Sequence, residues 1–222
     1  PRIRSFVRRE GRLTPGQQRA MDQLFPRFGI DAGEARLDFD VIFGRRAPRI
    51  LEIGFGNGET LAEIARTHPE NDYLGIEVHR PGVGHLLQLI EEHGLSNLRV
   101  MSEDAVEIME KQIPDDSLDA LYLFFPDPWH KKKHHKRRQV QPAWAQLVRK
   151  KLKRGGRLHM ATDWENYAEH MLAVLSVAEG YANTSATAEY VTKPDYRPET
   201  KFERRGLRLG HGVWDLVFEK VS

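Results

Sequence analysis

The chain has 222 residues, of which 40% are hydrophobic and 30% charged, enough to build one sizeable core. It contains no cysteine, which excludes disulfides, thiolate zinc sites and cysteine nucleophiles. The formal net charge is only +2, and no apolar run approaches the roughly 20 residues that cross a bilayer. We therefore expect a cytoplasmic protein without a membrane anchor.

The positive charges are concentrated in one part of the chain. Residues 129–157 contain twelve Lys/Arg and no acid, which leaves 22 Lys/Arg against 32 Asp/Glu elsewhere. A basic block on an otherwise acidic protein predicts a surface for a polyanion. The alternative is a solvated basic loop followed by a helix whose C-terminal cations suit the helix dipole. Two smaller basic clusters point the same way: Arg2, Arg4, Arg8, Arg9 and Arg12, and Lys201, Arg204, Arg205 and Arg208.

The first 30 residues are expected to form a basic arm and a short helix. Thr14 followed by Pro15 and Gln17 combines an N-cap, a proline at the first helical position and a capping-box partner. Residues 31–222 are then expected to form a single domain.

From Arg49 onward, short apolar runs alternate with amphipathic stretches. The expected strands cover residues 49–54, 73–78, 97–102, 118–125 and 156–162, and the expected helices 58–69, 82–94, 105–113, 142–152 and 164–179. Residues 188–192 and 213–221 are expected to add two strands with no clear helix between them. The pattern predicts an α/β fold with a doubly wound, mostly parallel seven-stranded sheet and an antiparallel hairpin at one edge.

Four acids fall at or near the carboxyl ends of the expected strands, where ligands bind in doubly wound sheets. They are Glu52, Glu77, Asp104 and Asp127. The glycine-rich stretch "GFGNG" (residues 54–58), with Gly54 and Gly56, follows the first strand and lets a nucleotide approach the backbone. We therefore expect a nucleotide-like ligand at this edge.

The charges around the glycine loop bear on which ligand it binds. Glu77, about 20 residues on, can accept from ribose hydroxyls, which also fits a dinucleotide. However, the spacing is G-x-G-x-G, and carboxylates at Glu52 and Glu59 would repel a pyrophosphate. They suit S-adenosylmethionine, which carries an ammonium and a sulfonium, and Asp104 would then lie near its adenine amino group.

The fourth strand leads into "FPDPWHKKKHHKRR" (residues 125–138). Pro126 and Pro128 hold Asp127 in a stiff, extended turn, and Trp129 offers a flat face for stacking a base. The alternative is a tight turn with a capping aspartate and a half-buried tryptophan. The histidines 130, 134, 135 and 159 lack metal-ligand spacing, so we expect surface positions or RNA contacts for them and no metal site.

The chain resembles the bacterial tRNA (guanine-N7)-methyltransferases, which have the Rossmann-like class I methyltransferase fold. The stretches that carry the resemblance are "RSFVRREGRLTPGQQ" (4–18), "LEIGFGNGE" (51–59), "GIEVHRPGVG" (75–84), "LSNLRVMSEDA" (95–105), "LFFPDPWHKKKHHKRR" (123–138), "HMATDWENYAEHM" (159–171), "TKFERRG" (200–206) and "LGHGVWDL" (209–216). The combination of the strand-four stretch with "TKFE" is highly specific.

The resemblance implies the remaining roles. The cofactor would be S-adenosylmethionine, contacted by Glu52, Glu77, Asp104 and Asp127, and Asp127 would be the active-site residue. The substrate nucleoside would contact Lys131, Asp163, Thr200, Lys201, Phe202 and Glu203. The RNA would lie against Lys133, His134, His135, Lys136, Arg137 and Arg138. The target would be the variable-loop guanosine of tRNA, position 46, and no obligate protein partner is expected.

Three other classes compete with this interpretation. A non-catalytic RNA-binding module with a vestigial pocket is disfavoured by the four aligned acids. A dinucleotide-dependent oxidoreductase is disfavoured by the glycine spacing. A small-molecule methyltransferase leaves the basic block without a role.

Overall fold

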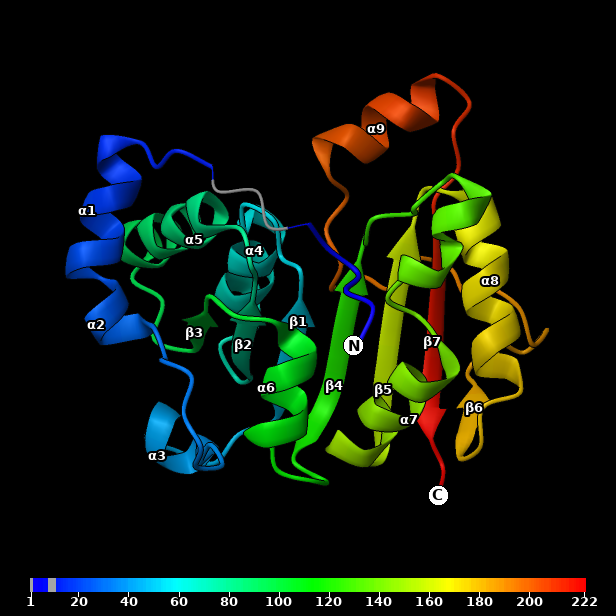
Figure 1. The fold of residues 1–222 in the computed structure, drawn as a ribbon, viewed down its shortest axis with the longest axis horizontal. Helices are drawn as coiled ribbons and strands as arrows, with labels where there is room; N and C mark the ends of the chain where they lie inside the picture. Colours follow the sequence, from blue (N-terminus) through cyan, green and yellow to red (C-terminus); the bar gives the residue numbers. More distant parts are fainter. Residues whose placement is uncertain (1, 8–10) are drawn as a thin grey trace.

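A seven-stranded sheet lies between two layers of helices in the computed structural model, which describes residues 2–7 and 11–222 (Figure 1). The strands are β1 (Arg49–Ile53), β2 (Asp72–Ile76), β3 (Leu98–Met101), β4 (Leu118–Phe124), β5 (Leu152–Thr162), β6 (Tyr181–Asn183) and β7 (Trp214–Lys220). Their order is β3-β2-β1-β4-β5-β7-β6, and β7 runs antiparallel to both of its neighbours. Arg8 and Arg9 of the predicted basic arm lie outside the described residues.

The helices alternate with the strands along most of the chain. They are α1 (Pro15–Gln23), α2 (Phe25–Phe28), α3 (Phe39–Phe43), α4 (Glu59–Thr67), α5 (Arg80–His93), α6 (Ala105–Lys111), α7 (Pro142–Lys151), α8 (Glu165–Ser176) and α9 (Lys201–Arg208), with a 3₁₀-helix η1 at Lys132–Arg137. The predicted capping box opens α1: Gln17 N donates to Thr14 Oγ1 at 3.1 Å, and Thr14 N donates to Gln17 Oε1 at 3.0 Å.

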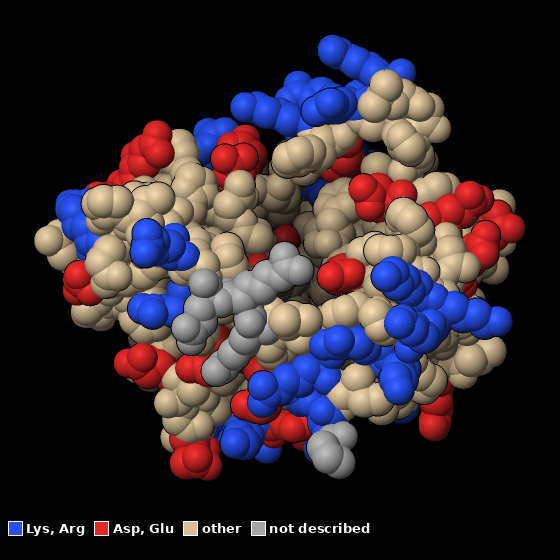
Figure 2. All heavy atoms as spheres, turned by 45° about the horizontal axis from the view of Figure 1, so that its top comes forward, with Lys and Arg blue, Asp and Glu red and all other residues tan. Residues whose placement is uncertain are grey.

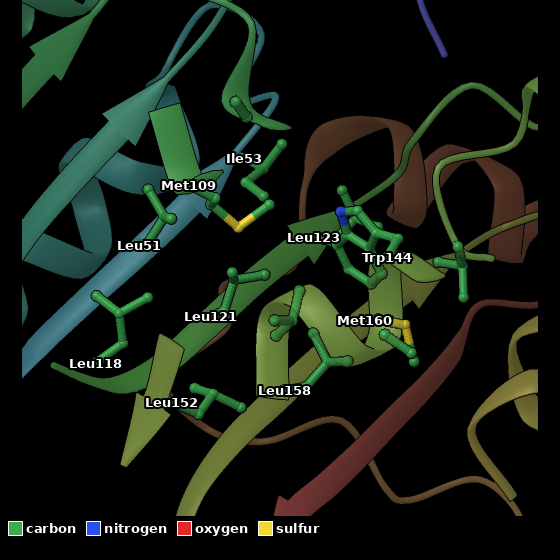
Figure 3. Close-up of a cluster of buried hydrophobic side chains, with 14 of the residues drawn as sticks. Leu51, Ile53, Met109, Leu118, Leu121, Leu123, Trp144, Leu152, Leu158 and Met160 are labelled. Carbon is green, nitrogen blue, oxygen red and sulfur yellow. The ribbon is translucent and has the colours of Figure 1, made fainter. Parts of the chain in front are cut away.

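Successive residues of a strand face opposite sides of the sheet, so each face has its own hydrophobic core. Leu51 and Ile53 of β1 pack with α6, α7 and α8, as Figure 3 shows for the centre of this cluster. Ile50, from the same strand, packs with α1, α4 and α5 on the other face. The alternation also decides that Glu52 faces the α4 side, whereas its neighbour Ile53 faces the α6 side.

Helices α1 and α2 pack on the sheet domain. Ala20, Leu24 and Phe28 are buried in the same cluster as α5, and Gly29 forms a parallel bridge with Val100 beside β3. The boundary at residue 30 between arm and domain stays a prediction. Within the described residues, no helix is both long and apolar enough to span a membrane.

The C-terminal part of the chain differs from its prediction. The antiparallel edge pair is confirmed, but its outer strand is Tyr181–Asn183, and the expected strand at 188–192 contributes only a bridge from Val191 to Asp215. Pro194 follows shortly after and lacks a backbone donor, so the ladder cannot continue there. The region between the two strands was expected to hold no helix, and this was wrong, because Thr200 and Glu203 form a capping box that starts α9.

The glycine loop sits between β1 and α4, and the start of α5 supports it from behind. Gly54, Gly56 and Gly58 all have positive φ (64–80°), which only glycine adopts without strain. A Cβ atom at Gly82 of α5 would overlap the carbonyl oxygen of Gly56. The backbone of α5 therefore approaches the loop as closely as it can.

Candidate active site

Two cavities adjoin at the carboxyl ends of the parallel strands. The first, which we call the strand-end cavity, measures about 570 Å³ and lies over β1, β2 and β4. The second, the α9 cavity, measures about 660 Å³ and lies beside α9. Both are lined by Gly54, Gly56 and Phe125, so the glycine loop and the end of β4 form their common wall.

The strand-end cavity brings together three of the four predicted acids: Glu77, Asp104 and Asp127. Glu77 Oε1 accepts from Gly56 N at 2.9 Å and its Oε2 from Val78 N at 2.7 Å, so this carboxylate holds the glycine loop in place. Asp104 is the N-cap of α6, where its Oδ1 accepts from Val106 N at 3.0 Å. These carboxylates are fixed by backbone groups before any ligand binds.

The N-terminal arm lies across the same cavity. Ser5, Phe6 and Val7 line it, and the Arg2 guanidinium pairs with Asp104 Oδ2. The indole Nε1 of Trp129 donates to the carbonyl of Ser5 at 2.9 Å. Sequence reasoning did not anticipate this contact, because the arm is about 100 residues away from both partners along the chain.

The turn after β4 holds Asp127 in the strand-end cavity. Asp127 Oδ1 accepts from Trp129 N at 2.8 Å, the capping arrangement that the sequence left as an alternative. Phe125 and Trp129, on either side of the Pro-Asp-Pro segment, have φ of 52° and 43°, in the left-handed region that costs free energy for such residues. The Trp129 ring is covered by the Arg137 guanidinium, 4.0 Å from its centroid, instead of being free to stack a base.

The fourth predicted acid, Glu52, lines the α9 cavity instead. Its side chain lies on the α4 face of the sheet, is only 3% exposed, and leaves Oε2 without a hydrogen-bond partner. Burial, with a smaller contribution from the charge of Glu77, raises the pKa of Glu52 to about 8. A buried carboxyl with an unsatisfied oxygen next to the glycine loop fits a cationic ligand group.

Several predicted substrate contacts also line the α9 cavity, together with Trp164. They are Asp163, Thr200, Phe202 and Glu203. Lys131 and Lys201 are exposed, and neither lines one of the two cavities. The structure thus gathers most of the predicted substrate-binding residues around the α9 cavity and leaves Lys131 and Lys201 outside its lining.

Glu203 is held inside the protein by a network that the sequence did not reveal. Its carboxylate accepts from Arg197 Nη1 at 2.5 Å, and Arg197 also donates from Nε and Nη2 to the two oxygens of Asp215, both at 2.8 Å. All three side chains are at least 94% buried. Burial alone would lower the pKa of Arg197, but its hydrogen bonds to the Asp215 and Glu203 carboxylates, together with their charges, outweigh burial and raise that pKa. The network joins α9 to β7.

His159 extends this network, and its expected surface position was wrong. It lies in β5 beside β7 and is completely buried. Burial lowers its pKa, against the opposing hydrogen bond and charge of Asp215, and this favours the neutral imidazole. Its Nε2 then donates to Asp215 Oδ1 at 2.7 Å, and its Nδ1 accepts from the Tyr196 hydroxyl at 2.6 Å. Among the described residues, no group of acids and histidines is arranged to hold a metal ion.

The basic stretch forms η1 beside the strand-end cavity. Lys133 and Lys136 are exposed, whereas His134, His135 and Arg137 are half-buried. Arg138 is only 3% exposed: its Nε donates to the Pro128 carbonyl and its Nη2 to Asn166 Oδ1, both at 2.8 Å. This guanidinium ties the Pro-Asp-Pro turn to α8.

Comparison with known proteins identifies the family. Residues 46–216 match the model of a family described as "putative methyltransferase". A tRNA (guanine-N(7)-)-methyltransferase of Aeromonas hydrophila is 62% identical over 221 residues, which cover 100% of this chain and 93% of that protein. One of Alcanivorax borkumensis is 61% identical over 219 residues, or 99% of this chain and 92% of that protein. The chain belongs to the tRNA (guanine-N7)-methyltransferase family.

Solved structures agree with this family at the level of the fold. The 16S rRNA methyltransferase KamB superposes with a TM-score of 0.60 at 15% identity, covering 82% of this chain and 92% of that one. TrmN from Thermus thermophilus superposes with a TM-score of 0.54 at 18% identity, and the match covers 78% of this chain and 44% of that one. The predicted class I methyltransferase fold is therefore confirmed.

Proposed function

We propose that the protein transfers a methyl group from S-adenosylmethionine to N7 of the variable-loop guanosine of tRNA, position 46. The observation that carries the proposal is the pair of cavities with a common glycine-loop wall in a chain of this family. The strand-end cavity offers carboxylates, and the α9 cavity offers carboxylates and aromatic rings. A cytoplasmic location belongs to the same proposal.

The residues of the strand-end cavity suit the methyl donor. Glu77 would accept from the ribose hydroxyls and Asp104 from the adenine amino group, and Gly54 and Gly56 allow close approach to the backbone. Glu52, across the common wall, would pair with the ammonium through the oxygen that has no partner. The bound cofactor supplies a methyl group activated by a positively charged sulfur. For Asp104 to take up this role, the side chain of Arg2 must move from its carboxylate.

The acceptor needs orientation rather than a base. N7 of guanine carries a lone pair and no proton, so the protein has to align this atom with the methyl group, an effect worth up to several kcal/mol. Asp127, held in the stiff turn at the edge of the strand-end cavity, would stabilise the positive charge that moves onto the purine. Asp163 would accept from the N1 and N2 donors of the base, whereas Glu203 is already bound to Arg197.

The RNA backbone would lie along the exposed cations of η1. Phosphate contacts position a folded RNA while the reacting base is presented individually. Lys133, Lys136 and the half-buried Arg137 are the residues that we propose for these contacts, with His134 and His135 between them. Arg138 would act indirectly, by supporting the turn that carries Asp127.

The test is to incubate the protein with methyl-labelled S-adenosylmethionine and unmodified tRNA transcript, then digest the RNA and identify the labelled nucleoside. We expect 7-methylguanosine, and none when the guanosine at position 46 is replaced. Label in another nucleoside would overturn the substrate assignment. Cofactor binding without transfer to tRNA would leave the strand-end cavity as a methyl-donor site and reject tRNA as the acceptor.

A further inference from the structure

Two aromatic side chains stand in solvent at the rim of the α9 cavity. The structure describes every phenylalanine, tyrosine and tryptophan of the chain, and of these only Trp164 and Phe202 are exposed, at 42% and 85%. Both line the α9 cavity, one from the start of α8 and the other from α9. Burial of such rings is favourable, so their shared exposure at one cavity points to a ligand that covers them.

The other aromatic rings near the two cavities already have partners. Trp129 is covered by Arg137, and Tyr196 stacks on Tyr122 with their centroids 5.2 Å apart and their planes 8° apart. The Trp164 ring, by contrast, meets His130 at 5.9 Å and a tilt of 50°, which leaves much of the indole uncovered. The stacking surface predicted at Trp129 is thus available at Trp164 instead.

The backbone that carries both rings is fixed. Trp164 is the N-cap of α8, and its N–H donates to Thr162 Oγ1 at 3.2 Å. Phe202 lies inside the capping box of α9, one residue before Glu203, which Arg197 anchors to β7. Exposed side chains on an immobilised backbone lose less entropy when they bind, so the two rings are prepared for a flat partner.

The surroundings indicate which flat partner fits. Asp163, next to Trp164, offers acceptor oxygens inside the cavity, and guanine presents its N1–H and N2–H₂ donors along one edge. Cations of α9 gather outside the cavity: Lys201, Arg204, Arg205 and Arg208. Figure 2 shows Lys and Arg over α9 at the top and again on the right, with a hollow between them. Acceptors inside and cations outside match a single base that projects from a phosphate backbone.

We infer that Trp164 and Phe202 form a stacking clamp for the target guanine in the α9 cavity, which rests on the proposed function. Trp164 provides the larger platform, and Phe202 closes over the base from α9. Stacking of this kind contributes roughly 1–3 kcal/mol per base, or about a 5- to 150-fold change in binding.

The experiment combines activity with a fluorescent base. Wild type, W164L, W164F, F202L and the control L207A, which changes an exposed residue of α9 outside the cavity, are assayed for methyl transfer to tRNA and for cofactor affinity. We expect W164L and F202L to raise the KM for tRNA by roughly 5- to 150-fold with cofactor affinity unchanged. W164F should recover much of the loss because it retains an aromatic face, and L207A should behave as wild type.

The second measurement uses a transcript with 2-aminopurine at position 46, at saturating protein. Stacking on the indole should keep its emission lower in the wild-type complex than in the W164L complex. Equal emission in the two complexes would overturn the clamp. So would KM values for W164L and F202L that equal the KM of L207A. If wild type transfers no methyl group to guanosine at all, the proposed function fails instead, so the two failures are distinguishable.

Discussion

The two cavities share one wall but are built in different ways. The carboxylates of the strand-end cavity stand within three residues of the ends of β2, β3 and β4, and backbone N–H groups of the same segments hold them. The α9 cavity uses a helix above the carboxyl ends of the strands, fixed through Arg197 to β7 (Figure 1). The carboxylates of the first cavity are therefore positioned by the parallel sheet and the segments that follow its strands, whereas the position of α9 in the second depends on one long-range ionic network. We therefore expect that a substitution can disrupt one cavity and leave the other intact.

The change with the largest expected effect removes the anchor of α9. Arg197→Met leaves Asp215 and Glu203 buried without their cation, and loss of one partner in a buried ionic group costs about 3–5 kcal/mol. We expect the free energy of unfolding to fall by this amount in urea titrations. Arg204→Met, at an exposed position of the same helix, should leave it nearly unchanged.

If the cavities are independent, the folded fraction of Arg197→Met still binds S-adenosylmethionine with wild-type affinity while its KM for tRNA rises. A parallel loss of cofactor affinity would show that the ionic network supports both cavities.

The next effect concerns the acid in the turn after β4. Asp127→Asn keeps the side chain's shape and its hydrogen bond to Trp129 N but removes the negative charge. We expect kcat to fall about 100-fold or more, equivalent to about 2.7 kcal/mol, and cofactor affinity to stay within about tenfold. Single-turnover methyl transfer and equilibrium cofactor binding separate the two quantities. Undiminished kcat would remove Asp127 from the catalytic role.

A smaller effect is a pH dependence of stability that comes from Glu52. Its carboxyl has a pKa of about 8 in the folded protein, against 4.5 for the unperturbed group, so the folded state retains a proton that the unfolded state loses. The stability that this proton contributes is complete below pH 4.5 and declines as the pH rises to about 8. Between pH 6 and pH 8, wild type should lose about 2–3 kcal/mol more than Glu52→Gln.

Chemical denaturation of both proteins at these two pH values measures the difference. Bound S-adenosylmethionine should reduce it, because a cationic group beside Glu52 favours the ionised carboxylate. Identical pH profiles of the two proteins would mean that Glu52 is ionised in the folded state.

The smallest effect distinguishes exposed from buried cations in the basic stretch. Lys133→Ala with Lys136→Ala should weaken tRNA binding and reduce the slope of log affinity against log salt by roughly 0.7–0.9 for each phosphate that is no longer neutralised. The melting temperature should not change, since both side chains are exposed. Arg138→Ala is the matched contrast: it should lower stability. An unchanged salt slope in the double variant would mean that these two lysines do not contact the RNA phosphates.

Much of the strand-end cavity was predictable because local patterns determine it. Glu77, Asp104 and Asp127 each follow an apolar run that forms a strand, and parallel strands bring their carboxyl ends together. The capping box at Thr14 was likewise visible in four consecutive residues. Glu52 was grouped with the other three acids, but it lines the α9 cavity, because alternation along β1 turns its side chain to the α4 face of the sheet.

The α9 cavity was harder to predict because its parts meet only in the folded chain. Thr200 and Glu203 carry the same capping-box spacing as Thr14 and Gln17, so this signal was present, but a short and highly charged segment gave no apolar periodicity to support it. The buried contact of Arg197 with Asp215 joins a loop to a strand, and a single sequence does not reveal such pairs. The exposure of the Trp164 ring is seen only in the folded structure, because the sequence does not show which tryptophan is left uncovered.

The close approach of α5 to the glycine loop limits which amino-acid substitutions the protein tolerates there. Any side chain at Gly82 pushes on the carbonyl of Gly56, and Gly56 belongs to the wall that both cavities use. A change at Gly82 therefore alters the lining of both cavities at once. Substitutions at Gly82 should therefore be among the rarest in a saturation library, and any survivor should carry compensating changes on both sides of the loop.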